Sequence, residues 1–254
     1  MAITIKSERE IELMAEAGKI LERVHNELEK ALHPGMSTKD IDTLGEKIIR
    51  SYECIPSFLN YNGYPASICV SVNQEVVHGI PDKHRIIHEG DIVSLDAGVI
   101  YKGYHSDAAR THAVGEVSEE AKKLIQVTKE CFFEGIKYAK AGNHLFDISG
   151  AIGRYAEERG YGVVRDLCGH GIGTALHEAP EIPNYEVGRK GVKLRPGMTL
   201  AIEPMINIGT YEVDWLDDDW TVVTRDGSLS AHYENTILIT EGEPRILSLT
   251  CDNE

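Results

Sequence analysis

Residues Gly90 to Asp107, GDIVSLDAGVIYKGYHSD, place two carboxylates within apolar, β-branched sequence. The pattern predicts two strands joined by a turn at 101–103. If the loop is centred on residues 101 and 102, antiparallel pairing sets Asp96 directly opposite Asp107 on one face of the hairpin. Like charges at that distance require a shared proton or a cation between them. The alternative interpretation is that Asp107 begins a loop and Asp96 marks a bend.

The composition of the chain excludes several classes of protein. The chain has 254 residues, of which 42% are hydrophobic and 26% charged, as is ordinary for a soluble globular protein. A formal charge of −15 argues against a specific nucleic-acid surface and against anchoring on anionic lipid. We find no apolar run long enough to span a membrane and no signal-peptide pattern, so we expect a cytoplasmic protein. The five cysteines form no CxxC pair, which predicts reduced thiols.

Helical periodicity predicts two helices in the first part of the chain. Ser7 and Glu10 form a capping box before a helix over about residues 8–32, and His-Pro-Gly at 33–35 ends it. A second helix is predicted from residue 37 or 38 to about residue 52. A turn-rich segment, a strand at 67–72 and the tetrapeptide His78-Gly-Ile-Pro81 follow.

The second half of the chain repeats this order of elements, with helices predicted at about 118–140 and 146–159. His177-Glu-Ala-Pro180 echoes the first tetrapeptide. One offset of 107 residues relates the landmarks Gly35 and Gly142, Asp40 and Asp147, Ile41 and Ile148, Gly90 and Gly197, and Asp96 and Glu203. We therefore predict an α/β (α+β) fold of two similar halves, about 7–112 and 114–250. Each half has a helix pair on antiparallel strands, and together they form one continuous sheet and a single domain over 1–254, since no Pro/Gly/Ser-rich linker separates them.

Three more polar residues stand in unusual surroundings. Glycines flank His170 in CGHGIG and leave its imidazole accessible. Glu203 and Glu234 lie in apolar strand patterns, which do not bury a lone carboxylate without compensation. Each has an alternative interpretation, because a glycine-flanked histidine can mark a turn and a strand carboxylate can pair with Arg or Lys.

Four carboxylates and one imidazole form the candidate metal site: Asp96, Asp107, His170, Glu203 and Glu234. Two divalent cations would balance the four negative charges, whereas a site for one ion would leave carboxylates to spare. Oxygen-rich ligation with a single nitrogen fits Mn²⁺, Fe²⁺, Co²⁺ or Zn²⁺ and selects none of them.

Successive segments of the chain resemble the signatures of the type I (short, bacterial-type) methionine aminopeptidases. In chain order these segments are NGYPASICVSVN, HGIP, GDIVSLDAGVIYKGYHSD, CGHGIG with HEAP, PGMTLAIEPMIN and AHYENTILIT. The resemblance covers about residues 7 to 250. It implies the pseudo-twofold "pita-bread" fold and a metal-dependent hydrolase that removes the N-terminal methionine from nascent polypeptides and peptides when the second residue is small. We expect a monomer with no membrane partner, and a transient ribosome contact stays open.

The resemblance also implies roles for single residues. The five metal ligands of the family fall on the five residues of the candidate site, and Glu203 serves in addition as a proton shuttle. His78 and His177 contact the substrate around the scissile bond and do not bind metal. The alternative for each of these two histidines is a purely structural role.

The methionine side-chain pocket of the family maps to Tyr61, Tyr64, Cys69, His78 and Trp220, all of which are present. Two positions depart from the family pattern. Phe58 stands where a cysteine is frequent, and Leu176 stands where a phenylalanine is frequent. Both replacements are apolar, so we expect the polarity of the pocket to be unchanged. The sequence does not predict the volume of the pocket.

Two other readings of the fold compete with this one. Prolidases and aminopeptidases P share the fold but carry an extra N-terminal domain, whereas the first half-repeat begins at Ser7 here. A non-enzymatic peptide-binding member of the fold would have lost metal ligands, and all five residue types are present. We therefore expect a methionine-specific peptidase.

Overall fold

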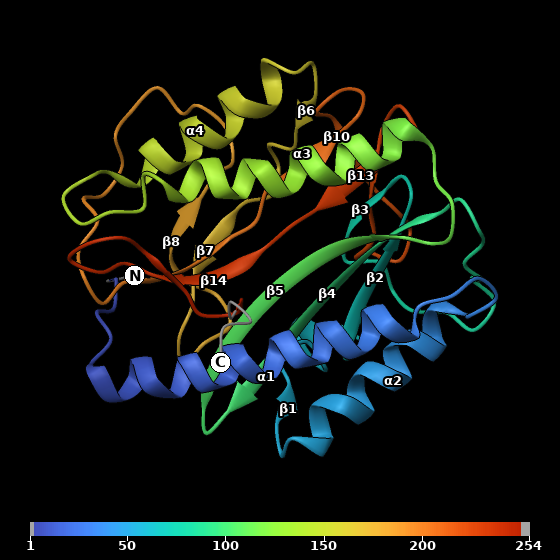
Figure 1. The fold of residues 1–254 in the computed structure, drawn as a ribbon, viewed down its shortest axis with the longest axis horizontal. Coiled ribbons are helices and arrows are strands. Elements are labelled where there is room, and N and C mark those ends of the chain that lie inside the picture. Colours follow the sequence, from blue (N-terminus) through green and yellow to red (C-terminus); the bar gives the residue numbers. More distant parts are fainter. Residues whose placement is uncertain (1–2, 250–254) are drawn as a thin grey trace.

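The computed structural model describes residues 3–249 and contains four long helices within that range (Figure 1). These are α1 (Glu8–Ala31), α2 (Thr38–Ser51), α3 (Glu119–Ile136) and α4 (Leu145–Glu157). All four predicted helices are confirmed to within a few residues at their ends. Figure 1 shows α1 and α2 next to each other in the lower part of the view and α3 and α4 next to each other in the upper part.

The strands are mostly short. They are β1 (Ile55–Pro56), β2 (Ile68–Val72), β3 (Glu75–Val77), β4 (Ile92–Tyr101), β5 (Tyr104–Ala113), β6 (Gly162–Val163), β7 (Gly169–Gly171), β8 (Glu178–Ile182), β9 (Thr199–Ile202), β10 (Met205–Asn207), β11 (Val213–Trp215), β12 (Val222–Thr224), β13 (Ser230–His232), β14 (Asn235–Leu238) and β15 (Arg245–Ile246). A single 3₁₀ turn, η1, spans Tyr61–Gly63. Every strand pairing among these residues is antiparallel.

The expectation of one continuous sheet is wrong, because the strands divide among four hydrogen-bonded sheets. The largest contains β15-β14-β9-β7-β8, and the longest strands, β4 and β5, belong to another. Ala109 and Glu234 exchange two backbone hydrogen bonds, of 3.3 and 3.0 Å, between the halves. Tyr233 and Glu234 lie between β13 and β14, so the ladder is interrupted where a polar side chain turns inward.

The register of the β4–β5 hairpin differs from the predicted one. Tyr101 pairs with Tyr104 around a two-residue turn, so Asp107 lies opposite Gly98 and Asp96 lies opposite Ala109. Lys102 and Gly103 have φ values of 49° and 86°, as this type of tight hairpin turn requires. The shift is two residues, and side chains alternate with a period of two, so Asp96 and Asp107 still share one face as diagonal neighbours.

The offset of 107 residues recurs in the backbone hydrogen bonds. The isolated bridges Ser37–Ile86 and His144–Lys193 are equivalent under it. The amide of Gly35 donates to Ile87 at 2.8 Å, and the amide of Gly142 donates to Leu194 at 3.0 Å. Both glycines adopt φ near +95°. The sequence repeat therefore corresponds to a structural one.

Each helix pair covers its own apolar core. Leu21 of α1 and Ile41 of α2 pack in a cluster with Leu95 of β4, whereas Phe132 of α3 and Ile148 of α4 belong to a second cluster. Truncating such a buried side chain to alanine costs roughly 2–5 kcal/mol. The cores thus hold the strands, and with them the polar residues between the halves, in fixed positions.

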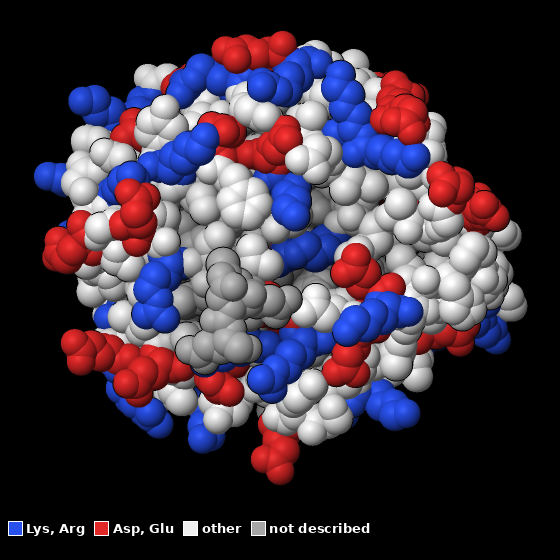
Figure 2. All heavy atoms as spheres, in the orientation of Figure 1, with Lys and Arg blue, Asp and Glu red and all other residues white. Residues whose placement is uncertain are grey.

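The face of the molecule that carries α1 and α3 is mixed in charge (Figure 2). Figure 2 shows acidic and basic side chains interspersed over the face that carries α1 and α3. Within residues 3–249, we find no helix that combines the length and the apolar character needed to cross a bilayer.

Candidate active site

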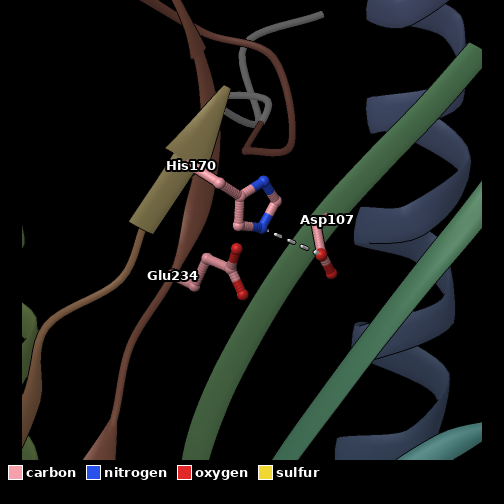
Figure 3. Close-up of side chains that lie close together, drawn as sticks. All are labelled: Asp107, His170 and Glu234. Atoms are coloured by element: carbon pink, nitrogen blue, oxygen red, sulfur yellow. Dashed lines mark ion pairs between the residues drawn. The ribbon is translucent and has the colours of Figure 1, made fainter. Parts of the chain in front are cut away.

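The five predicted ligand residues come from both halves of the chain. Asp96 lies in β4, Asp107 in β5 and His170 in β7, while Glu203 directly follows β9 and Glu234 directly precedes β14. Figure 3 shows the side chains of Asp107, His170 and Glu234 pointing toward one another from three separate segments of the chain. All five residues line one cavity.

Distances between these side chains suit metal coordination. Ligand atoms of Asp107, His170 and Glu234 all lie within 4.8 Å of one another. His170 Nε2 is 3.8 Å from Asp107 Oδ2 and 3.6 Å from Glu203 Oε1. The other ring nitrogen of His170, Nδ1, lies 2.9 Å from the Gly171 carbonyl and donates to it. That bond assigns the ring proton to Nδ1 and leaves the Nε2 lone pair facing the carboxylates.

The carboxylates are held in an unfavourable electrostatic environment. Burial raises the pKa of Asp96, and burial together with the charges of Asp96 and Glu203 raises the pKa of Asp107 well above its usual value. The pKa of Glu203 and that of Glu234 are also well raised, first by burial and then by the neighbouring carboxylates. Such a cluster is stabilised by a positive charge at its centre.

Several oxygens of the cluster have no hydrogen-bond partner among the described residues. They are Asp96 Oδ1, Asp107 Oδ1 and Glu234 Oε1, and all are buried. Buried carboxylate oxygens are normally hydrogen-bonded, paired or coordinated to a metal. The orphaned oxygens, the free Nε2 of His170 and the raised carboxyl pKa values all fit a metal-binding site among these residues.

We call the five candidate ligand residues the floor of the cavity and the rest of its lining, which is mostly apolar and aromatic, its walls. The cavity has a volume of about 210 Å³, and all eight predicted substrate-binding residues line it: Phe58, Tyr61, Tyr64, Cys69, His78, Leu176, His177 and Trp220. The rings of Tyr64 and Trp220 meet edge to face at 5.1 Å. Tyr64 Oη donates to the Gly79 carbonyl at 2.9 Å, which fixes this wall.

Two histidines border the cavity outside the ligand cluster. His177 is exposed, its Nδ1 lies 3.0 Å from Tyr61 Oη, and its ring centroid lies 4.2 Å from that of His170. His78 has a φ of 59°, an uncommon conformation for a residue with a side chain. Burial, with a smaller contribution from His177, lowers the pKa of His78 to about 4, and partial desolvation lowers the pKa of His177. Both imidazoles are therefore neutral at pH 7.

The sequence reasoning missed further residues of the site. The apolar residues Val77, Leu167 and Met205 and the polar residues Asn62 and Cys168 also line the cavity. His232 does not line the cavity itself, and its Nε2 lies 3.9 Å from Glu203 Oε2. A signal for His232 was present, since it precedes Glu234 by two residues and the period of a strand points both side chains the same way.

Comparison with known proteins agrees with this geometry. The model of metallopeptidase family M24 matches residues 12–241. A methionine aminopeptidase of Clostridium acetobutylicum is 59% identical over 247 residues, covering 97% of this chain and 99% of that protein. The crystal structure of a methionine aminopeptidase from Thermotoga maritima is 47% identical with a TM-score of 0.96, and the match covers 98% of this chain and 100% of that one. The chain belongs to metallopeptidase family M24 and, within it, to the bacterial-type methionine aminopeptidases.

A more distant solved structure helps to separate the competing readings. The Xaa-Pro dipeptidase from Bacillus anthracis is 27% identical with a TM-score of 0.78, and the match covers 98% of this chain but only 63% of that one. The predicted pita-bread fold and family are thus confirmed, and similarity is far greater to the methionine aminopeptidases than to the Xaa-Pro enzyme.

Proposed function

We propose that this chain hydrolyses the peptide bond after an N-terminal methionine when the second residue is small, and that two divalent metal ions take part. One observation carries the proposal: the buried ligand cluster is the floor of a cavity whose walls are apolar and aromatic. The floor suits hydrolysis of a peptide bond, and the walls suit a long apolar side chain held next to it.

The walls favour methionine among apolar side chains. Phe58, Tyr64, Cys69 and Leu176 are buried, and Trp220 closes the slot against Tyr64. An unbranched, polarizable thioether fits such an aromatic surface well. The departures at Phe58 and Leu176 keep the wall apolar, so they alter its shape and leave its chemistry unchanged.

The five ligand residues, Asp96, Asp107, His170, Glu203 and Glu234, would hold the metal ions. Four ionised carboxylates carry four negative charges, which two divalent ions neutralise. Bound metal ions supply Lewis-acid activation of water and of the scissile carbonyl. The oxygen-rich donor set fits Mn²⁺, Fe²⁺, Co²⁺ or Zn²⁺.

The residues of the chain supply proton transfer and transition-state hydrogen bonding. Glu203 accepts the proton of the attacking water and returns it to the leaving amine. Tyr61 Oη lies 3.0 Å from His177 Nδ1. In the proposed mechanism the Tyr61 hydroxyl donates to Nδ1, so the His177 proton is on Nε2, where it stabilises the developing oxyanion. His78, neutral because its pKa is lowered to about 4, assists near the scissile nitrogen.

We further propose that the chain acts as a cytoplasmic monomer with one catalytic unit. The ligand residues come from both halves, so neither half alone contains the site.

Peptide hydrolysis tests the proposal directly. We expect kcat/KM to be high for Met-Ala-Ser, strongly reduced for Met-Phe-Ser, and reduced for Leu-Ala-Ser, since a branched side chain loses only about 1–3 kcal/mol in an apolar slot. The alternative, an Xaa-Pro peptidase, predicts preference for Ala-Pro-Ser. Equal rates on Met-Ala-Ser and Met-Phe-Ser, or a preference for Ala-Pro-Ser, would contradict the proposal. A binding protein without activity would cleave none of the four.

A further inference from the structure

His232 is a buried histidine to which the mechanism above gives no role. It is the last residue of β13, and its side chain is 2% exposed. Neither ring nitrogen has a hydrogen-bond partner among the described residues. Leaving a buried polar group unpaired costs roughly 1–3 kcal/mol, so a retained buried imidazole calls for a physical reason.

Glu203 presents its two carboxylate oxygens to two different histidines. Oε1 lies 3.6 Å from His170 Nε2, on the side of the ligand cluster. Oε2 lies 3.9 Å from His232 Nε2, on the opposite side. One oxygen therefore faces the proposed metal site, while the other faces a ring nitrogen that can carry a proton.

Strand register fixes His232 beside Glu203. Met205, two residues after Glu203, pairs with His232 where β10 meets β13. The hydroxyl of Thr111 accepts a hydrogen bond from the His232 amide and donates one to the His232 carbonyl, both at 2.9 Å. The main chain of His232 is thus held from two sides, and its ring stays against Glu203.

We propose that His232 is a positioning residue for Glu203. Its Nε2–H donates a hydrogen bond to Glu203 Oε2 and holds the carboxylate in the orientation in which it accepts the proton of the attacking water. A movement of about 1 Å brings the two atoms to hydrogen-bond distance. This inference rests on the proposed function, because it concerns the proton-transfer step of the same site.

Two substitutions at His232 test the role. His232→Leu removes the donor and keeps an apolar side chain of similar size, whereas His232→Gln keeps a side-chain N–H. His112→Leu is the control, because the His112 side chain is 13% exposed, its Nδ1 lies 3.6 Å from Glu29 Oε1, and it does not line the cavity. Each protein is assayed on Met-Ala-Ser for kcat and KM, and its metal stoichiometry and melting temperature are measured.

We expect His232→Leu to lower kcat at least about 10-fold, the scale for losing one hydrogen bond to a charged group. KM and metal stoichiometry should stay unchanged, and His232→Gln should retain kcat within about threefold. The control His112→Leu should not show this fall in kcat.

The inference is overturned if His232→Leu keeps kcat, if His232→Gln is impaired as much as His232→Leu, or if His232→Leu loses metal. Should His232→Leu fail to fold, His232→Met takes its place under the same criteria. An inactive parent protein would instead contradict the proposed function, so the two failures are distinguishable.

Discussion

The hydroxyl of Thr236 lies 2.9 Å from both the amide nitrogen and the carbonyl oxygen of Asp107, so it accepts one hydrogen bond and donates the other. Thr236 belongs to β14 and Asp107 to β5, and the two strands lie in separate sheets. A side chain from the second half thus holds the main chain of a candidate ligand in the first half. Contacts between the two halves therefore help to position the candidate ligand Asp107.

Replacing Thr236 should weaken both the fold and the metal site. Thr236→Val keeps the branched shape but leaves the Asp107 amide and carbonyl without these partners, which we expect to lower the free energy of unfolding by about 1–3 kcal/mol. Metal affinity should fall as well, because Asp107 loses its fixed position. Urea unfolding and titration calorimetry measure the two effects. The control Thr43→Val removes an exposed hydroxyl that bonds the Lys39 carbonyl, and equal losses in both variants would contradict the prediction.

Removing metal should abolish hydrolysis. Exhaustive chelation is expected to stop cleavage of Met-Ala-Ser, and adding Mn²⁺ or Co²⁺ should restore it. Asp107→Asn should be nearly inactive, because it removes a negative charge and a candidate ligand oxygen from the cluster. Asp166→Asn, at an exposed position, serves as the control. Full activity of rigorously metal-free protein would show that the ligand cluster has another purpose.

The two neighbouring histidines should behave differently although their rings lie only 4.2 Å apart. His177→Ala is expected to lower kcat at least about 100-fold, the scale for one transition-state donor, with metal content unchanged. His170→Ala should instead lose metal, because Nε2 of His170 faces the carboxylates. Metal analysis of both purified variants decides between the roles, and reversed stoichiometries would mean that the assignments are exchanged.

Two tryptophans near one hairpin offer a matched test of the methionine slot. Trp220 lines the cavity, whereas Trp215 is 50% exposed and lies outside it. Trp220→Ala should lower kcat/KM for Met-Ala-Ser by about 10-fold or more, because one wall of the slot is lost. Trp215→Ala should leave kcat/KM unchanged. A similar effect of the two substitutions would argue that the hairpin acts through its general stability.

The stability of metal-free protein should fall as the pH rises above about 6.5. Burial raises the pKa values of Asp107, Glu203 and Glu234 in the folded state, and a raised carboxyl pKa means that stability is lost as the pH rises through it. Buried histidines with lowered pKa values have the opposite effect on stability, but this effect is confined to pH values below their ordinary pKa. For His78, with its pKa lowered to about 4 from 6.5, the gain in stability is complete near pH 6.5.

Melting temperatures measured at about pH 6.5 and 8, with and without Mn²⁺, test this expectation. Bound metal favours ionised carboxylates, so the difference between loaded and metal-free protein should widen at the higher pH. Metal-free protein that melts at the same or a higher temperature at pH 8 would contradict the prediction.

Much of the fold could be predicted because its signals are local. The Ser7 and Glu10 capping box, the glycines at 35 and 142, and the apolar spacing within each helix act over a few residues, and the helices begin and end close to the predicted positions. The offset of 107 residues was also visible, since equivalent backbone positions in a repeat require equivalent residues. These local signals predicted two similar halves, with Asp96 and Glu203 at equivalent positions of the repeat.

Other features depend on which strands meet in space, and only the tertiary structure decided them. The turn at Lys102 and Gly103 sets Asp107 opposite Gly98, and the inward turn at Glu234 interrupts the sheet. The contacts of Tyr61 with His177 and of His232 with Glu203 join residues far apart in the chain. A sequence pattern fixes the face on which a strand residue lies, but register and packing between the halves fix its neighbours.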